Sequence, residues 1–152
     1  YPVAVTATMA PPNVKGAENP DTSVMTVEYP GNLLATFNLG YRAMHYNFTN
    51  DQLQQFHGTK ARLDLGRESI ALYPQSEDVE MKPEGRKHLP KTFEPASHAH
   101  IRNFLDCVRS RQEPHTPIEA GQSANIILAM AVESMWSGRR VRWNQGSQRM
   151  ET

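Results

Sequence analysis

The spacing of apolar residues changes once along this chain, and that change constrains the fold more than any other feature. Up to residue 73, apolar and polar side chains alternate with a period of two, which is typical of strands with one buried face. Beyond residue 97 they recur at helical intervals, as in Ile101, Phe104, Leu105 and Val108. The change predicts an α+β fold: a mostly antiparallel, open-faced sheet, a meander of about six to eight strands, with two C-terminal helices packed on one side.

Turn residues divide the alternating region into short strands. We expect a hairpin with strands at 23–29 and 33–41, because Pro30 and Gly31 occupy the central positions of a type II turn. Prolines predict surface loops at two places, residues 11–21 and 75–95. The other expected strands cover residues 3–9, 43–48, 52–57, 61–65 and 70–73.

Two helices are expected after the sheet. The first has Ser97 as its N-cap and is stopped by Pro114. The second begins at Thr116, because Thr116 and Glu119 have the spacing of a capping box and Pro117 stands at the first helical position.

The second helix is expected to be buried and to end at Gly138. Its residues 126–132 are apolar on nearly every side, which predicts burial. Residues 139–143 alternate again and predict a final strand. We therefore expect one α+β domain at 1–143, followed by a polar, frayed tail at 144–152.

Composition excludes several classes of protein. The chain has 152 residues, enough for one domain, and its 16 basic and 16 acidic residues cancel. A balanced charge argues against nucleic-acid and polybasic membrane binding, so we expect no nucleic-acid and no membrane partner. The longest apolar run has seven residues, Ile126 to Val132, against about 20 in a membrane span. No leader opens the chain, so we expect a cytoplasmic location, although an upstream export signal stays open.

The glycines and the cysteine exclude further sites. No two glycines are closer than eight residues, so the chain has neither a dinucleotide-binding glycine loop nor a P-loop. Cys107 is the single cysteine, which excludes an internal disulfide and a thiolate zinc site; we interpret it as a small core residue. Because Tyr1 leads directly into a predicted strand, we interpret the chain as a piece of a longer protein.

Four polar and aromatic residues stand close together on a predicted strand: Tyr41, Arg42, His45 and Tyr46. On the open face of a sheet they could line a ligand cleft, which makes them the substrate-side candidates. An ordinary solvated sheet face explains them equally well, and both interpretations stay open.

The first predicted helix carries histidines and arginines with simpler explanations. His98 and His100 are two residues apart and point in different directions on a helix, so we interpret them as solvated or capping residues and expect no metal site. Arg102, Arg109 and Arg111 could bind anions but are more typical of a solvated helix face. Spacing identifies no acid–base or nucleophile–base pair, so we assign no catalytic residue.

Four segments of the C-terminal part form a recognisable set: HIRNFLDCVRSR at 100–111, Glu113-Pro114, IEAG at 118–121 and GRRVRW at 138–143. Together they resemble the C-terminal signature of the glucose–fructose oxidoreductase, inositol dehydrogenase and MocA (Gfo/Idh/MocA) family. The turn at 57–59 and the strand at 63–65 also resemble that family.

The resemblance implies the C-terminal, substrate-side and oligomerisation domain of a two-domain, NAD(P)-dependent oxidoreductase acting on sugars, polyols or related compounds. It implies NAD or NADP in the full-length parent, bound by an N-terminal Rossmann domain that is missing here. The family's catalytic lysine motif and its Asp and His pair would also precede this chain. We therefore expect the fragment to bind no cofactor and to be inactive alone, and we assign it no cofactor-binding residue.

The implied partners are the missing Rossmann domain, a carbohydrate-like small molecule and a second copy of the chain. Self-association is expected through the open sheet face, where Leu34 adds an apolar group opposite the face of Leu33. Two alternatives stay open. One is a non-catalytic, self-associating sheet scaffold; the other is an independent small-molecule domain with Tyr41, His45 and His57 in a cleft.

Overall fold

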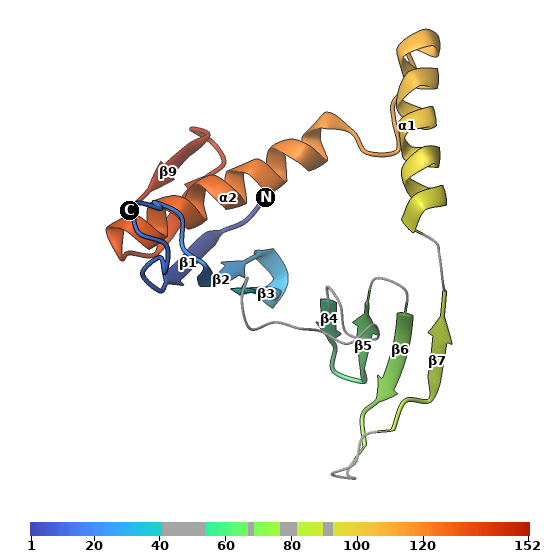
Figure 1. The fold of residues 1–152 in the computed structure, drawn as a ribbon, viewed down its shortest axis with the longest axis horizontal. Coiled ribbons are helices and arrows are strands. Elements are labelled where there is room, and N and C mark those ends of the chain that lie inside the picture. Colours follow the sequence, from blue (N-terminus) through green and yellow to red (C-terminus); the bar gives the residue numbers. More distant parts are fainter. Residues whose placement is uncertain (41–53, 67–68, 77–81, 90–92) are drawn as a thin grey trace. The chain divides into compact units, whose positions relative to one another are not determined.

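A computed structural model describes residues 1–40, 54–66, 69–76, 82–89 and 93–152 of the chain (Figure 1). Two helices and antiparallel strands make an α+β fold, which confirms the predicted class. The described strands form two sheets, of five and four strands, where one continuous meander was expected. They belong to two compact units, which are taken separately below: Tyr1–Met44 with Thr116–Thr152, and His45–His115.

The five-stranded sheet joins the two ends of the chain. Its strand order is β3-β2-β1-β8-β9, and every neighbouring pair is antiparallel. β9 contradicts the expected frayed tail, because its residues pair with β8 in register. The strands are β1 (Ala4–Met9), β2 (Thr22–Glu28), β3 (Leu34–Gly40), β8 (Val141–Asn144) and β9 (Arg149–Glu151).

The predicted hairpin between β2 and β3 is confirmed. Its turn contains a short 3-10 segment, Pro30–Asn32, with Gly31 at a φ of 75°. That backbone conformation is rare for a residue with a Cβ and open to glycine, which is why Gly31 fits this position. The Tyr29 N–H donates to the Leu33 carbonyl at 2.9 Å and closes the turn.

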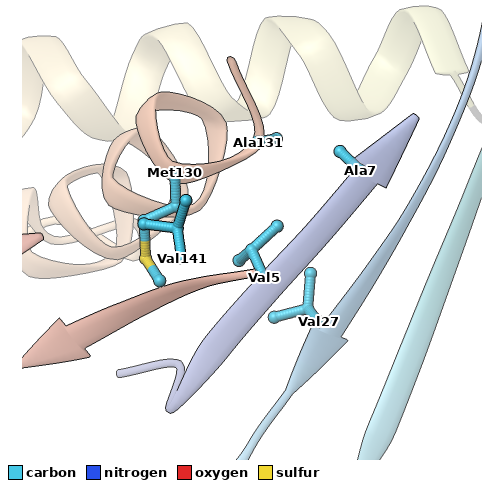
Figure 2. Close-up of a cluster of buried hydrophobic side chains, with 6 residues drawn as sticks. All are labelled: Val5, Ala7, Val27, Met130, Ala131 and Val141. Carbon is cyan, nitrogen blue, oxygen red and sulfur yellow. The ribbon is translucent and has the colours of Figure 1, made fainter. Parts of the chain in front are cut away.

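Helix α2 (Ile118–Ser137) covers one face of this sheet and forms the main core with it (Figure 2). Met25, Val27 and Tyr29 alternate along residues 23–29 and pack on the core side. Each fully buried Val or Met side chain stabilises the fold by about 1.5–3 kcal/mol. The buried apolar cluster consists of Val5, Ala7, Val27, Met130, Ala131 and Val141.

Ser134 on α2 is the one buried polar residue among those described, and it ties the helix to the sheet. The Ala7 N–H on β1 donates to its hydroxyl oxygen at 2.8 Å. The same hydroxyl donates to the Arg139 carbonyl at 2.6 Å. β8 pairs with β1 at Ala4 and Val5, so the serine supplies the acceptor for Ala7 where no β8 residue pairs with it.

The C-terminal end of α2 is as predicted, and its N-terminal end is not. Gly138 ends the helix in a left-handed conformation and donates its N–H to the Ser134 carbonyl at 2.9 Å. The expected Thr116 cap is wrong, because the N-cap residue is Pro117, in extended conformation, and no side chain caps the helix. The helix is also less buried than its composition predicted, since Leu128, Val132 and Trp136 are at least half exposed.

The four-stranded sheet has the order β4-β5-β6-β7 and is antiparallel throughout. β7 lies within residues 75–95, where a surface loop was expected, so that prediction is wrong there. β7 is a polar edge strand, and its register with β6 defines it although no apolar alternation marks it. The strands are β4 (Gln54–His57), β5 (Ala61–Leu65), β6 (Ser69–Pro74) and β7 (Gly85–His88).

Helix α1 (Phe93–Ser110) begins four residues before the expected N-cap at Ser97. Pro95 lies in its first turn, where a missing N–H costs no helical hydrogen bond. The helix ends at Ser110, before Pro114, because Arg111 turns into the left-handed region with a φ of 61°. Neither helix of the described chain is long and apolar enough to cross a membrane.

Candidate functional site

The four substrate-side candidates, Tyr41, Arg42, His45 and Tyr46, lie outside the described residues. The same holds for the predicted strand at 43–48. Their interpretation as a cleft lining therefore stays a prediction.

The four-stranded sheet carries a set of polar side chains that interact with one another. Its register separates two faces with different chemistry, because successive residues of a strand point to opposite sides. One carries the apolar side chains of Phe56, Leu63, Leu65, Ile70 and Leu72. The other, called the polar face below, carries Gln55, His57, Arg62, Asp64, Tyr73 and Arg86.

Asp64 is the central acceptor of the polar face. Arg62 donates to both of its oxygens, at 2.9 Å from Nε and 3.2 Å from the terminal nitrogen. Gln55 on the neighbouring strand donates to the same carboxylate at 3.2 Å. Both partners of the Arg62–Asp64 pair are partly buried, so the carboxylate is neutralised and held in place.

Tyr73 links the two arginines of the polar face. The Arg62 guanidinium lies over its ring, 4.3 Å from the centroid, in a cation–π arrangement. Arg86 on β7 donates to the Tyr73 hydroxyl at 3.2 Å. Tyr73 is 9% exposed, so its ring and hydroxyl are held among these side chains. The arrangement can present guanidinium and phenol donors to a ligand.

The sequence pattern indicated a shared strand face for two residues of this cluster and did not mark the cluster as a site. The alternation of Arg62 and Asp64 with apolar neighbours placed them on the wet side of a strand. Tyr73 was expected in a strand with Ile70 and Leu72, and its place on the face of Arg62 follows from the observed register. Arg86 was missed, because the four residues of β7 carry no apolar alternation, and no sequence signal separates them from a loop.

Helix α1 presents a second surface. His98, Ile101, Arg102 and Leu105 line a shallow groove along one side of the helix. The apolar residues of the stripe predicted for it, including Phe104, are 44% to 58% exposed.

Helix α1 also carries the two histidines and the cysteine considered from the sequence. Among the described residues, no cluster of three metal-ligating side chains exists, and His98 and His100 stand inside the helix rather than at its start. Cys107 is half buried rather than fully buried, and its thiol lies 3.6 Å from the Glu113 carbonyl.

The open face of the five-stranded sheet is mainly polar. The register aligns Thr6, Thr26 and Thr36 across three strands on the side away from α2. Leu34 is on the same side and is 60% exposed. This face therefore combines hydroxyl groups with exposed apolar side chains, Leu34 on β3 and Val24 on β2, which is 40% exposed.

Arg140 and Glu28 form a bidentate ion pair at the edge of the open face. Arg140 donates to both oxygens of Glu28, at 2.7 Å and 2.5 Å. This hydrogen bonding lowers the pKa of the Glu28 carboxyl below its usual range, and the charges of Arg140 and Arg142 act in the same direction. The pKa of Arg140 is raised, chiefly by the same hydrogen bond.

Residues 2–142 match the model of a Gfo/Idh/MocA oxidoreductase family, described as its C-terminal alpha/beta domain. A comparison with curated protein sequences found no match.

Solved structures share the fold at low sequence identity. Levoglucosan dehydrogenase, in complex with NADH and levoglucosan, has a TM-score of 0.71 at 14% identity, covering 93% of this chain and 44% of that one. An oxidoreductase from Agrobacterium radiobacter, in complex with NAD+, L-tartaric acid and magnesium, has a TM-score of 0.64 at 15% identity, covering 93% and 43%. The WlbA dehydrogenase from Bordetella pertussis, in complex with NADH and UDP-GlcNAcA, has a TM-score of 0.56 at 17% identity, covering 94% and 39%. The chain spans less than half the length of each of these proteins.

Proposed function

The chain belongs to the Gfo/Idh/MocA oxidoreductase family, as its C-terminal alpha/beta domain, and from this premise we propose that it is the substrate-side domain of an NAD(P)-dependent oxidoreductase. The substrates proposed for the full-length parent are sugars, polyols or related compounds. The observation that carries the proposal is the family match over residues 2–142, which covers both described helices, the described strands β1 to β7 and the first two residues of β8.

The ligands of the structural neighbours support the cofactor and the substrate class. Three of them are complexes with NADH or NAD+, and their second ligands are levoglucosan, UDP-GlcNAcA and L-tartaric acid. These second ligands are hydroxylated small molecules, and two of them are sugar derivatives. We extend the same class of chemistry to the parent of this chain.

The cofactor site of the parent is proposed to lie on a separate Rossmann domain that precedes residues 1–143. The glycine spacing supports this division, because the chain has no phosphate-binding glycine loop. The low coverage of the neighbours also supports it, since more than half of each lies outside the match. The chain alone is accordingly proposed to be inactive, with Tyr41, Arg42, His45 and Tyr46 contacting the substrate in the parent.

Self-association through the open face of the five-stranded sheet is part of the proposal, with a cytoplasmic location. The sheet's other face is covered by α2, so the open face is the one left for a second copy. Exposed Leu34 supports a contact there, although the row of three threonines makes the face less apolar than the sequence predicted.

The experiment that tests the proposed function compares the parent with the 152-residue chain. The parent is expected to reduce NAD or NADP with a sugar or polyol from a substrate panel, followed by nicotinamide absorbance. Calorimetry of the chain alone with NAD and NADP is expected to give no heat above dilution. Micromolar binding by the chain alone, or a parent with no nicotinamide-dependent turnover on the panel, would overturn the proposal.

A further inference from the structure

The polar face carries two arginines, and one of them, Arg86, has no carboxylate partner among the described residues. The carboxylate of Asp64 is occupied by the bidentate contact with Arg62. In the described part of the chain, Arg86 has no carboxylate partner, and its one hydrogen bond runs to the Tyr73 hydroxyl. Glu84 lies two residues before Arg86 and is exposed, yet no ion pair joins them. The positive charge of Arg86 is therefore available to a ligand.

The neighbours of Arg86 orient it, while Arg86 itself is exposed. Tyr73 is held by its own burial and by Arg62 above its ring, so the hydroxyl that receives the Arg86 hydrogen bond is a fixed acceptor. The residue in register with Arg86 on β6 is Ala71, which is 6% exposed and therefore covered by neighbouring atoms. A guanidinium held at one nitrogen keeps its other N–H groups in a planar fork.

Two kinds of donor then converge on one point of the polar face. The free N–H groups of Arg86 match the two oxygens of a carboxylate or phosphate, which planar guanidinium groups bind in bidentate fashion. The Tyr73 hydroxyl accepts from Arg86, and its own hydrogen has no acceptor among the described residues, so it can donate to the same anion.

We propose that Arg86 and Tyr73 form a binding site for an anionic group, a carboxylate or a phosphate, carried by a small molecule. The site is argued from the four-stranded sheet alone and stands independently of the oxidoreductase assignment. Arg62 and Asp64 position Tyr73 and do not bind the ligand themselves.

The test is a titration of the isotope-labelled 152-residue chain at constant ionic strength, followed by NMR. The probes are sodium glucuronate, inorganic phosphate and uncharged glucose. Saturable shifts of the Arg86 side-chain N–H and of the Tyr73 and Ala71 amides are expected with at least one anion at roughly 20 mM or below, and none with glucose. Glucuronate alone would identify a carboxylate site, and phosphate alone a phosphate site. No saturable shift at these residues with either anion would overturn the proposal.

Matched variants separate a specific site from general charge attraction. Arg86→Gln is expected to weaken anion binding by about tenfold or more, because a charge-assisted bidentate contact is lost. Lys87→Gln removes the same charge from the next residue, which points to the opposite face, and is expected to change binding less than about twofold. Tyr73→Phe keeps the ring and is expected to weaken binding by about threefold or more through the lost hydroxyl.

Circular dichroism of each variant checks that the sheet is retained. Should Arg86→Gln prove unfolded, the shift map of the unaltered chain decides the proposal by itself. Equal weakening by Arg86→Gln and Lys87→Gln would overturn it, since the anion would then respond to net charge rather than to this site.

Discussion

Replacing Ser134 by alanine removes the hydrogen-bond acceptor of a buried backbone N–H group. We expect this loss to be the main effect of the substitution on the free energy of unfolding. The Ala7 N–H donates to the Ser134 hydroxyl at 2.8 Å, and Ala7 is 8% exposed, so no water can take over that hydrogen bond without opening the contact of α2 with β1. A buried donor left without a partner costs about 1–3 kcal/mol. The Arg139 carbonyl also loses its donor, but Arg139 is exposed and water can replace it.

The expected loss translates into a measurable shift in melting temperature. For a chain of this size, each 1 kcal/mol lowers the midpoint by roughly 2–4 °C, so Ser134→Ala should melt roughly 2–12 °C below the unaltered chain. Thermal melts followed by circular dichroism, with urea titrations for the free energy of unfolding, measure it. Ser137→Ala is the matched control, because its exposed hydroxyl accepts from the Arg139 N–H at 3.3 Å and should matter little. Identical midpoints for the two variants would refute the reasoning.

Three further outcomes are expected. Thr116→Ala should change the free energy of unfolding by less than about 0.5 kcal/mol, because Thr116 is exposed and caps no helix; a urea titration that shows a loss near 1 kcal/mol would restore the capping box. Glu28 has a lowered pKa in the folded chain, so its pairing with Arg140 contributes above the unfolded value of 4.5 and is lost as pH falls through the folded value. Glu28→Gln should therefore be less stable than the parent chain near neutral pH and indistinguishable from it in strong acid, whereas a constant difference in urea titrations across pH would contradict this. Light scattering of the chain should give twice 17.2 kDa, and Leu34→Lys should reduce it toward the monomer while circular dichroism stays unchanged; a dimer insensitive to this change would place the interface elsewhere.

The parts of the fold that could be predicted are marked by residues that lie close together in the sequence. The β2–β3 hairpin is marked by Pro30 and Gly31 between two alternating runs, and Gly138 marks the end of α2, so short windows of sequence suffice for both. The start of α2 was misjudged because Thr116 and Pro117 both suit an N-terminal helix position. Sequence pattern does not decide which of two neighbouring residues takes the N-cap place.

The parts that were not predictable depend on pairing with distant residues. β7 and β9 are three or four residues long and polar, and each becomes a strand because β6 or β8 offers it hydrogen bonds. The anion site was hidden for the same reason, since Arg86 reaches Tyr73 through the register of β7 on β6. Alternation of apolar and polar residues reflects the burial of one face of a strand against the core. An edge strand with both faces in solvent therefore shows little alternation to detect.

The serine on α2 also bears on how this sheet could polymerise. An unpaired strand edge is a template for strands of other molecules, and β1 has such an edge beyond the two residues that β8 covers. The Ser134 hydroxyl occupies the Ala7 N–H at that edge, so an incoming strand would have to displace the helix to bond there. Among the described strands of this sheet, β3 and β9 are the two terminal ones, so strands of other molecules could add to the sheet at their outer edges. A side chain that stabilises the monomer thus also narrows the routes by which the chain could aggregate.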